Sequence, residues 1–423
     1  MPFTSLGLSP ALLRAVSAHG YLAPTPVQAA AIPATLQGRD VLGCAQTGSG
    51  KTAAFALPLL QHLESAPQHS PRRALVLVLV PTRELCTQVG EEIRKLALHL
   101  PRPLKVAMVF GGVSINPQMM RLRGGTDVVV ATPGRLLDLV AHNALSLGSV
   151  ATLVLDEADR LLDLGFAEEL ARLLTLLPPK RQNLFFSATF PAAVQALAQS
   201  LLHEPVRIEV LPTSQSLPDI TQRAIAVDAG RRTQLLRHLI GQHQWRRVLV
   251  FVATKHAAEI VADKLRKARI YAEPFHGELS QGKRTQVLAD FKASRLKVVV
   301  ATDVAARGLD IAQLPVVVNY DLPRSAVDYL HRIGRTARAG ESGVAVSFVS
   351  ADTEAHFRLI EKRQHLSLPL EQIEGFEPVQ TAAEVAPSGG GIKGKRPSKK
   401  DKLRQAARLG ADAAPATGAA SKT

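Results

Sequence analysis

A run of eight residues near position 50 has the composition of a phosphate-binding loop. Residues 45–52 read AQTGSGKT, in which glycines precede a lysine and a threonine. Glycines let backbone N–H groups close around phosphate oxygens, and a helix that starts there adds a favourable dipole. We expect Lys51 to reach the β- and γ-phosphates and the Thr52 hydroxyl to bind magnesium. The predicted loop consists of Ala45, which replaces the glycine of the strict pattern, Gln46, Thr47, Gly48, Ser49, Gly50, Lys51 and Thr52.

A second candidate is the acidic run at 156–159. It reads DEAD and follows the apolar residues Thr152–Leu155. Ligands of open parallel sheets bind outside the carboxyl ends of the strands, where these acids would stand. We expect Asp156 to hold magnesium, directly or through water, and Glu157 to orient and deprotonate an attacking water. A solvated acidic loop is the alternative that this motif alone leaves open.

Two further runs carry polar groups that could act on a phosphate. Residues 331–340 read HRIGRTARAG, and Arg335 and Arg338 are three apart, so they would share one face of a helix. Such a pair could reach a phosphate held by another domain, as an arginine finger does. A basic helix face that binds only nucleic acid, or nothing, remains open. Ser187 and Thr189 end an apolar run, and their hydroxyls could bond to the acidic run or to an opposing domain.

The elements that position these residues alternate along the chain. Short Val- and Leu-rich runs that do not alternate with polar residues are typical of parallel strands buried on both faces. Amphipathic stretches separate them, for example Ala53–Leu63, Arg83–Leu98, Gly134–Ala141 and Ala167–Leu177. This βα alternation predicts an α/β fold with doubly wound parallel sheets. The expected strands are Asp40–Ala45, Ala74–Pro81, Lys105–Phe110, Asp127–Ala131, Thr152–Leu155, Asn183–Phe186, Arg247–Val252, Lys297–Ala301, Val316–Tyr320 and Gly343–Val349.

The two halves of the chain echo one another. Residues 76–82 (VLVLVPT) resemble 248–254 (VLVFVAT), and 128–133 (VVVATP) resemble 298–303 (VVVATD). The offsets, 172 and 170, are nearly equal, which favours two tandem copies of one unit over a chance likeness of buried strands. We expect domains at 1–211 and 220–378, a linker at 212–219 and a disordered basic tail at 379–423.

The charge of the chain points to a polyanionic partner. The 423 residues include 51 Lys and Arg against 36 Asp and Glu, a net charge of +15, and residues 387–423 hold nine basic and two acidic residues. Aromatic residues make up only 4%, so a nucleic acid would be gripped by its backbone with little sequence readout. The longest aliphatic run, 74–80, is too short to span a membrane, and two cysteines favour a reducing cytoplasm.

Taken together, these motifs resemble those of the DEAD-box helicases, ATP-dependent RNA helicases of superfamily 2, in the same order over about residues 3–350. Phe3, Gly20 and Pro24–Gln28 look like the motif that reads adenine; the resemblance implies that Gln28 bonds the adenine edge and that Tyr21 and Phe3 pack near the base. Residues 45–52, 156–159 and 187–189 are similar to the family's motifs I, II and III, and alanine is normal at the first loop position.

The resemblance also implies an RNA-binding set. It extends to the residues that look like the RNA-backbone motifs and the motifs of the second domain: Pro81, Thr82, Arg83, Gly112, Thr132, Pro133, Arg135, Thr254, Gln281, Arg284 and Thr302 for RNA, Gly308 and Asp310 for nucleotide, and Arg335 and Arg338 as arginine fingers. Ala337 stands where the family often has glycine. The same likeness implies interdomain coupling through Asp159, Ser187, Thr189 and His331.

The family likeness implies a fold and an activity. We expect two RecA-like domains that close over ATP, magnesium and an RNA strand, and so open short duplexes or remodel ribonucleoprotein. An ATP-gated RNA clamp and a DNA translocase are the alternatives. The opening residues and the basic tail look most like the bacterial RhlE-like subgroup, and ribosomal or RNA-decay assemblies are possible partners.

Overall fold

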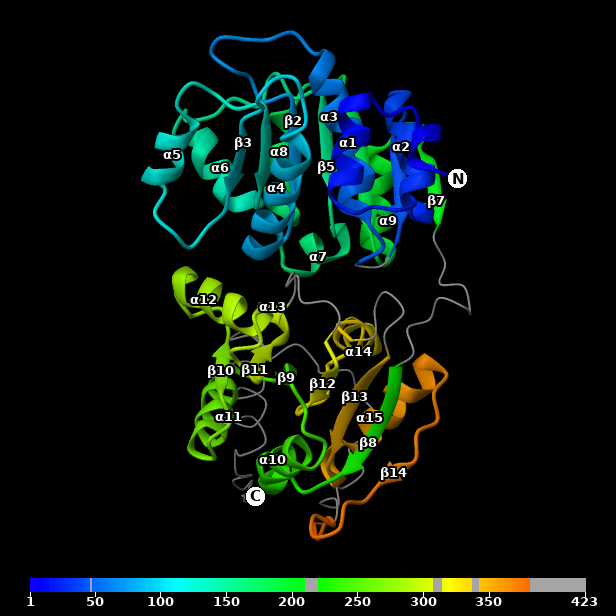
Figure 1. Ribbon diagram of the computed structural model, residues 1–423, viewed down its shortest axis with the longest axis vertical. Coiled ribbons are helices and arrows are strands. Elements are labelled where there is room, and N and C mark those ends of the chain that lie inside the picture. Colours follow the sequence, from blue (N-terminus) through cyan, green and yellow to red (C-terminus); the bar gives the residue numbers. More distant parts are fainter. Residues whose placement is uncertain (46–47, 210–219, 307–313, 337–341, 381–423) are drawn as a thin grey trace, which may run out of the picture. The chain divides into compact units, whose positions relative to one another are not determined.

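The computed structural model describes residues 1–45, 48–209, 220–306, 314–336 and 342–380. The first half of the chain forms one α/β domain around a parallel seven-stranded sheet, in the order β3-β4-β2-β5-β6-β1-β7 (Figure 1). Its strands are β1 (Val41–Cys44), β2 (Val76–Leu79), β3 (Val106–Val109), β4 (Val128–Ala131), β5 (Thr152–Leu155), β6 (Gln182–Ser187) and β7 (Val206–Glu209). Its α-helices are α1 (Pro10–Ala18), α2 (Pro26–Leu36), α3 (Lys51–Ser65), α4 (Arg83–Ala97), α5 (Asn116–Leu122), α6 (Pro133–Ala141), α7 (Ala158–Asp163), α8 (Ala167–Thr175) and α9 (Ala192–Leu201).

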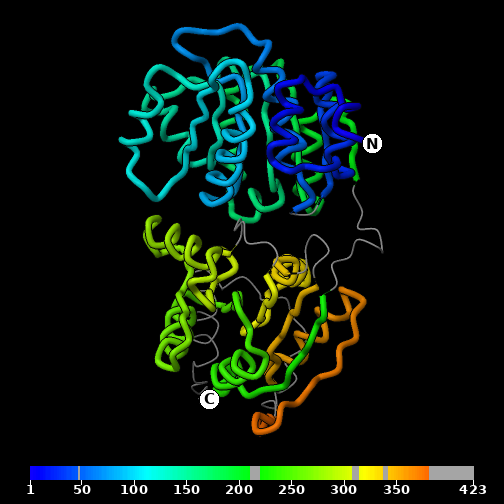
Figure 2. The backbone as a smooth tube through the Cα atoms, viewed as in Figure 1, coloured from blue at the N-terminus to red at the C-terminus, as the bar shows by residue number. Residues whose placement is uncertain are grey.

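The second half forms another seven-stranded parallel sheet, in the order β10-β11-β9-β12-β13-β8-β14. Its strands are β8 (Ile220–Ala226), β9 (Val248–Val252), β10 (Ala272–Phe275), β11 (Val298–Thr302), β12 (Val316–Asn319), β13 (Gly343–Val349) and β14 (Leu370–Glu371). Its α-helices are α10 (Arg232–Gln242), α11 (Lys255–Lys267), α12 (Gln281–Lys292), α13 (Asp303–Ala306), α14 (Ala326–Ile333) and α15 (Ala351–Gln364). The tube in Figure 2 shows that the chain completes the first domain before it enters the second.

The two sheets have the same strand order, which confirms the predicted tandem fold. Each strand of the first sheet has a counterpart: β2 corresponds to β9, β4 to β11, and β1 to β8. The first two of these pairs are the echoed sequences. Both central strands β2 and β9 are wholly buried, because helices cover both faces of each sheet, and this accounts for their unbroken apolar runs.

Local sequence sets where the helices begin. Thr82 follows β2, and its hydroxyl accepts a hydrogen bond from the N–H of Leu85 at 3.2 Å, so that it caps α4. Thr254 follows β9 and caps α11 in the same way, accepting from the N–H of Ala257 at 3.0 Å. Equivalent strand ends of the two copies therefore carry equivalent threonines.

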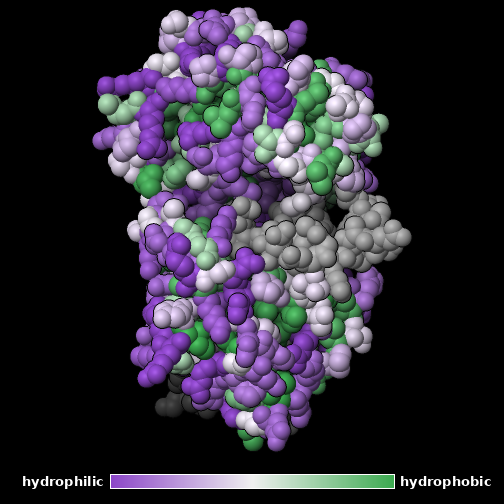
Figure 3. Space-filling view, viewed as in Figure 1, coloured by the Kyte–Doolittle hydropathy of each residue, from purple (hydrophilic) through white to green (hydrophobic). Residues whose placement is uncertain are grey.

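All ten strands predicted from the sequence are present, with ends that differ by at most two residues. Four strands of the described part of the chain were missed: β7, β8, β10 and β14. Hydrophilic side chains cover most of the face in Figure 3 and hydrophobic ones are scattered over it. Among the described residues, none of the helices has the length and apolar character needed to span a membrane. The predicted linker lies outside the described residues, as does the tail beyond residue 380.

Candidate nucleotide and RNA site

The predicted phosphate loop joins β1 to the first turn of α3. Gly48 and Gly50 have φ angles of 85° and 90°, which L-residues with side chains rarely adopt. The Lys51 side chain is buried, and its Nζ donates to the carbonyl oxygen of Ala45 at 2.9 Å, which closes the loop on itself. Gln46 and Thr47 lie outside the described residues.

Gln28 is packed against this loop. Its side-chain Nε2 donates to the carbonyl oxygen of Gly50 at 3.1 Å, and its Oε1 accepts from the N–H of Thr25 at 3.0 Å. A Cβ atom on Gly50 would lie 2.5 Å from that Nε2, so only glycine fits between the loop and α2. The residue expected at the adenine edge therefore also fixes the end of the phosphate loop.

The acidic run lies at the carboxyl end of β5. Asp156 is buried, and this burial raises the pKa of its carboxyl to about 6, while the Lys51 ammonium lowers it. Its Oδ1 accepts a hydrogen bond from the N–H of Glu157 at 3.0 Å. Glu157 has a φ of 53°, an unusual backbone conformation that turns the chain from β5 into α7. The structure thus brings Lys51 and Asp156, which are distant in sequence, to one buried place.

A residue that the sequence reasoning missed holds Glu157. Arg160 Nη1 lies 3.0 Å from Glu157 Oε2, and both side chains are at least nine-tenths buried. The i, i+3 spacing in the run EADR was the available signal. A buried ion pair of this kind fixes the carboxylate of the expected general base.

Asp159 links the acidic run to the end of β6. Its Oδ2 accepts hydrogen bonds from the Thr189 N–H at 3.0 Å and the Thr189 hydroxyl at 2.7 Å. The Asp159 N–H donates to Ser187 Oγ at 3.2 Å. Of the two partners that sequence left open for these hydroxyls, the acidic run is the one they contact.

The aromatic pair expected near the base is assembled. The rings of Phe3 and Tyr21 stack with centroids 6.4 Å apart. The Tyr21 hydroxyl donates to Glu92 Oε1 at 2.6 Å, and burial together with this bond raises the pKa of Tyr21. Phe3 itself is buried, in a short helical turn that packs against α2.

The expected RNA residues of the first domain surround the ends of β2 and β4. Thr82 caps α4 and is followed by Arg83; a Cβ on Gly112 would lie 1.9 Å from Arg83 Nη2, so Arg83 lies directly over that glycine. Pro81 and Thr132 follow β2 and β4, Pro133 opens α6, and Arg135 Nη2 donates to the carbonyl of Val113 at 2.8 Å. These segments, separate in sequence, form one edge of the sheet.

The second domain places Thr254 and Thr302 at the equivalent strand ends, after β9 and at the end of β11. Gln281 begins α12, and the Arg284 guanidinium lies 5.0 Å from the centroid of the Phe275 ring. These residues share the carboxyl edge of the second sheet.

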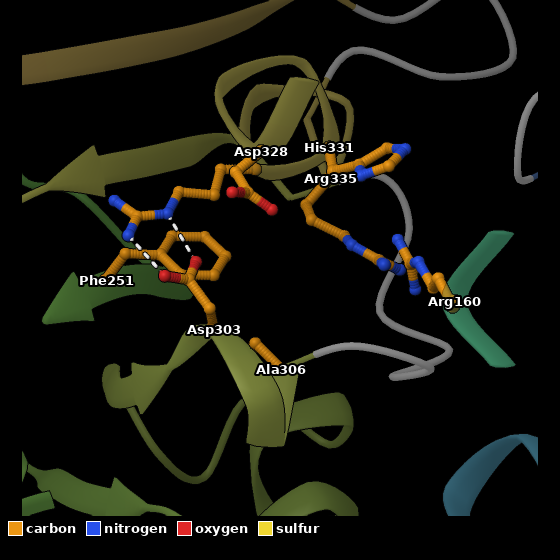
Figure 4. A pocket seen from close by; sticks show the side chains of 8 residues that line it. Arg160, Phe251, Asp303, Ala306, Asp328, His331 and Arg335 are labelled. Atoms are coloured by element: carbon orange, nitrogen blue, oxygen red, sulfur yellow. Dashed lines mark hydrogen bonds and ion pairs between the residues drawn. The ribbon is translucent and has the colours of Figure 1, made fainter. Parts of the chain in front are cut away.

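A second residue that sequence reasoning missed is Arg332 of α14. Its Nε and Nη2 donate to the two carboxylate oxygens of Asp303 at 2.6 and 2.7 Å, and its guanidinium lies 4.9 Å from the centroid of Phe251. Figure 4 labels Phe251 and Asp303 beside this pair, with dashed lines that end on Asp303. The bidentate pair ties α14 to α13, the helix that follows β11.

The shared helical face expected for Arg335 and Arg338 was not found as predicted. Helix α14 ends at Ile333 with Gly334 as its C-cap, so Arg335 lies beyond the helix. Glycine at this position costs the helix conformational entropy and favours its end there. Arg335 is buried, while Arg338, Gly308 and Asp310 lie outside the described residues.

The donor set beside the phosphate loop suits magnesium. The described residues contain no group of three or more His, Cys, Asp or Glu side chains placed to hold a metal by themselves. Magnesium usually takes one or two protein oxygens and completes its shell with water and phosphate oxygens. Asp156, a buried carboxylate next to the loop that carries the Thr52 hydroxyl, fits the role of such a ligand.

Both sheets and the strand–loop–helix turn define the class: two tandem RecA-like domains of the kind found in P-loop nucleotide-binding proteins. Two family models match, DEAD/DEAH box helicase over residues 25–197 and the helicase conserved C-terminal domain over residues 231–340. The chain belongs to the DEAD-box family of ATP-dependent RNA helicases.

Individual relatives agree. The chain is 40% identical to the DEAD-box ATP-dependent RNA helicase CshA of Bacillus cereus over 85% of this chain and 67% of that protein. It is 42% identical to the ATP-dependent rRNA helicase rrp3 of Emericella nidulans over 91% of this chain and 82% of the relative. Among solved structures, Dbp5 of S. cerevisiae bound to RNA and ADP BeF3 matches with a TM-score of 0.78 at 30% identity, over 88% of this chain and 95% of that one. Mss116p bound to ssRNA and AMP-PNP matches with a TM-score of 0.77 at 27% identity, over 87% and 78%.

Proposed function

We propose that this protein is an RNA-stimulated ATPase that locally unwinds short RNA duplexes or remodels ribonucleoprotein. The observation that carries the proposal is that two oppositely charged side chains, Lys51 of the phosphate loop and Asp156 at the end of β5, are both buried and interact electrostatically. Such a pair suits a phosphate chain with its metal. The nucleotide- and RNA-bound relatives, Dbp5 and Mss116p, support the same substrates for this chain.

Each polar group of the first domain has a role in this proposal. Lys51 leaves the Ala45 carbonyl to bind the β- and γ-phosphates, and the loop N–H groups bind the remaining phosphate oxygens. Thr52 and Asp156 hold magnesium, which supplies charge neutralisation of the phosphates when bound. Glu157 accepts the proton of the attacking water. The adenine contacts are assigned to Gln28, Tyr21 and Phe3.

Arginines of the second domain complete the hydrolytic site. We assign this role to Arg335 and Arg338, and a nucleotide contact to Gly308 and Asp310. The Arg332–Asp303 pair holds α14 against α13, so the arginine-bearing segment and the segment after β11 move together. Asp159, which donates its N–H to Ser187 and accepts two hydrogen bonds from Thr189, carries with His331 the signal that the domains have closed.

RNA lies along the carboxyl edges of both sheets. Thr82, Thr132, Thr254 and Thr302 occupy equivalent strand ends in the two copies, which supports a grip on the sugar-phosphate backbone that is repeated from domain to domain. The contacts that complete it are assigned to Pro81, Arg83, Gly112, Pro133, Arg135, Gln281 and Arg284. Backbone contacts position a strand without reading its sequence.

Finer assignments are also proposals. The opening residues and basic tail favour the RhlE-like bacterial subgroup, although the relatives named above carry other names. Both cysteines are free thiols, which favours a reducing compartment such as the cytoplasm. Ribosomal or RNA-decay assemblies are the proposed partners. Crosslinking in cells, followed by sequencing of the bound RNA, tests them.

Strand displacement with ATP turnover tests the activity. Wild-type protein should hydrolyse ATP faster with RNA than with DNA of the same sequence, since only RNA offers the 2′-OH, and should displace a short RNA strand. Glu157→Gln keeps the shape and removes the base, so it should retain ATP and RNA in a long-lived complex without turnover. Turnover without displacement would favour the clamp, and equal stimulation by DNA would favour the translocase.

A further inference from the structure

A pocket in the second domain lies outside the residues assigned above. It has a volume of about 400 Å³ and is lined by Arg231, Gln234, Arg237, His238 and Phe376. The first four residues lie at the start of α10 and on its exposed side, and the last belongs to the segment after β14. Figure 1 shows α10 beside that segment, at one end of the second sheet.

The floor of the pocket is a preformed stack. The Arg231 guanidinium lies 5.1 Å from the centroid of the Phe376 ring, and its Nη2 donates to the carbonyl of Gly375. The imidazole of His238 lies against the same ring, with centroids 5.2 Å apart. Because the guanidinium is fixed at one end by the backbone and on one face by the ring, its orientation is set before any ligand arrives.

Such a floor suits a nucleobase. Unstacked RNA bases bind by stacking on aromatic rings or on guanidinium planes, and by hydrogen bonds to their edges. The exposed amide of Gln234 offers a donor and an acceptor for a base edge, and the exposed Arg237 offers a charge for a phosphate. Glu374 and Glu377 belong to the same loop but do not line the pocket, and Glu377 Oε1 accepts the N–H of Gly375 at 3.1 Å.

The topology of the sheet gives an independent reason to expect a phosphate-bearing ligand here. Because the two sheets have the same order, β8 is the counterpart of β1, and α10 that of α3. Residues 227–231 therefore occupy the position that the phosphate loop occupies in the first domain. They read VDAGR and contain one glycine, so a phosphate would be held by side-chain cations here rather than by a cradle of N–H groups.

The pocket also lies on the proposed course of the RNA. Arg231 follows the carboxyl end of β8, and Thr254 and Thr302 stand at the carboxyl ends of β9 and β11, so all three share one edge of the sheet. β9 and β8 are three strand spacings apart, a distance of about 14 Å across the sheet, and the twist of the sheet increases the separation of their carboxyl ends. A short RNA that occupies only the contacts near Thr254 cannot reach the pocket, whereas a longer RNA can.

We propose that this pocket binds one nucleotide unit of the RNA strand, with its base stacked on the Arg231–Phe376 floor and its phosphate on Arg237. The proposal rests on the RNA-binding function proposed above and adds a contact that stacks on a base. The basic tail that begins just after Pro378 is excluded as the occupant, because residues 387–423 carry nine cations and would be repelled by two arginines. An acidic peptide would use the two arginines but not the stacked floor.

The test compares single-stranded RNAs of about 6 and about 20 nucleotides, by fluorescence anisotropy with a non-hydrolysable ATP analogue. The pocket variant is Arg231→Glu/Arg237→Glu in the full chain. Its matched control is Lys264→Glu/Arg269→Glu, which makes the same charge change at exposed sites at the far end of α11, near the amino edge of the sheet. A second variant, Phe376→Leu, keeps an apolar side chain in the core and removes the ring. Thermal melting checks that each variant folds.

All proteins should bind the short RNA equally. The pocket variant, but not its charge-matched control, should lose about tenfold in affinity for the long RNA, the loss expected for one base stack. Phe376→Leu should show a similar but smaller loss. Equal affinities for the long RNA in wild type, pocket variant and control would overturn the pocket while leaving the RNA-binding function standing. Failure of the wild type to bind either RNA would overturn that function instead. Two further probes, a mononucleotide and a poly-glutamate peptide, distinguish other occupants. If the wild type binds one of them and the pocket variant does not, while both proteins bind the long RNA equally, the assignment of the pocket to RNA is overturned.

Discussion

Replacing Asp156 by asparagine should stabilise the ligand-free protein while abolishing ATP hydrolysis. Burial raises the pKa of this carboxyl to about 6, from an ordinary value of 3.8. The folded state therefore holds the proton more tightly than the unfolded chain, so the ionised carboxylate weakens the fold above pH 6. This penalty disappears as the pH falls through 6 towards 4, and asparagine removes it at every pH.

The size of the effect follows from the shift in pKa. A difference of about two units corresponds to about 3 kcal/mol at pH 7.5, where the carboxylate is ionised in both states. Asparagine keeps the oxygen that accepts the Glu157 N–H, so the bond at 3.0 Å remains, and its new amide group offsets part of the gain. We expect a net gain of about 2 kcal/mol for the first domain.

Calorimetry without magnesium or nucleotide measures this gain. For a domain of about 200 residues, 2 kcal/mol raises the melting temperature of its transition by about 4–8 °C. The matched control is Asp138→Asn, an exposed carboxylate of α6 whose pairing with Arg135 at 3.5 Å contributes little. A variant that melts below wild type at pH 7.5, or a gain that persists undiminished at pH 4.5, would refute the reasoning.

Three further predictions concern catalysis and RNA binding. Lys51→Ala should abolish ATP hydrolysis and leave the circular dichroism spectrum unchanged, because the proposed role of the ammonium is to bind phosphates and its hydrogen bond in the structure is confined to the loop; turnover near wild type would exclude the phosphate-loop role. Arg335→Ala should cut RNA-stimulated turnover on the order of 10³-fold or more, as loss of an arginine finger can, and the fragment 1–211 should be equally inert; turnover by that fragment would show that the second domain is not catalytic. Deletion of residues 387–423, with their nine cations, should lower the salt slope of RNA binding by roughly 2–5 and leave turnover at saturating RNA unchanged; matching slopes in fluorescence titrations would show that the tail does not touch RNA.

The central strands could be predicted from the sequence because burial on both faces requires an unbroken run of apolar residues. β2 and β9 read as unbroken apolar runs, so they could be predicted as parallel strands buried on both faces. The missed strands have a weaker apolar pattern. β7 and β10 stand at the edges of their sheets and contain charged residues or proline. β8 mixes polar and apolar residues, and β14 is only two residues long.

The candidate site divides in the same way. Lys51, Asp156 and Glu157 could be predicted as candidates because each stands in a short motif whose spacing is set by one loop. The partners of those residues were not, because they depend on how a particular turn folds. Arg160 reaches Glu157 only after the chain turns through φ 53° into α7, and Arg332 reaches Asp303 only after α14 packs on the sheet. Contacts between motifs require the tertiary structure.

The position of β1 has a consequence for synthesis of the protein. This strand is made early, yet in the sheet it lies between β6 and β7, the last two strands of its domain, and Ala45 donates its N–H to the carbonyl of Ser187 at 3.1 Å. A growing chain therefore lacks the neighbours of the phosphate loop until about residue 209 has left the ribosome. Domains generally fold as units and the N-terminal one first, so the nascent first domain should acquire nucleotide binding abruptly, when its final strands arrive.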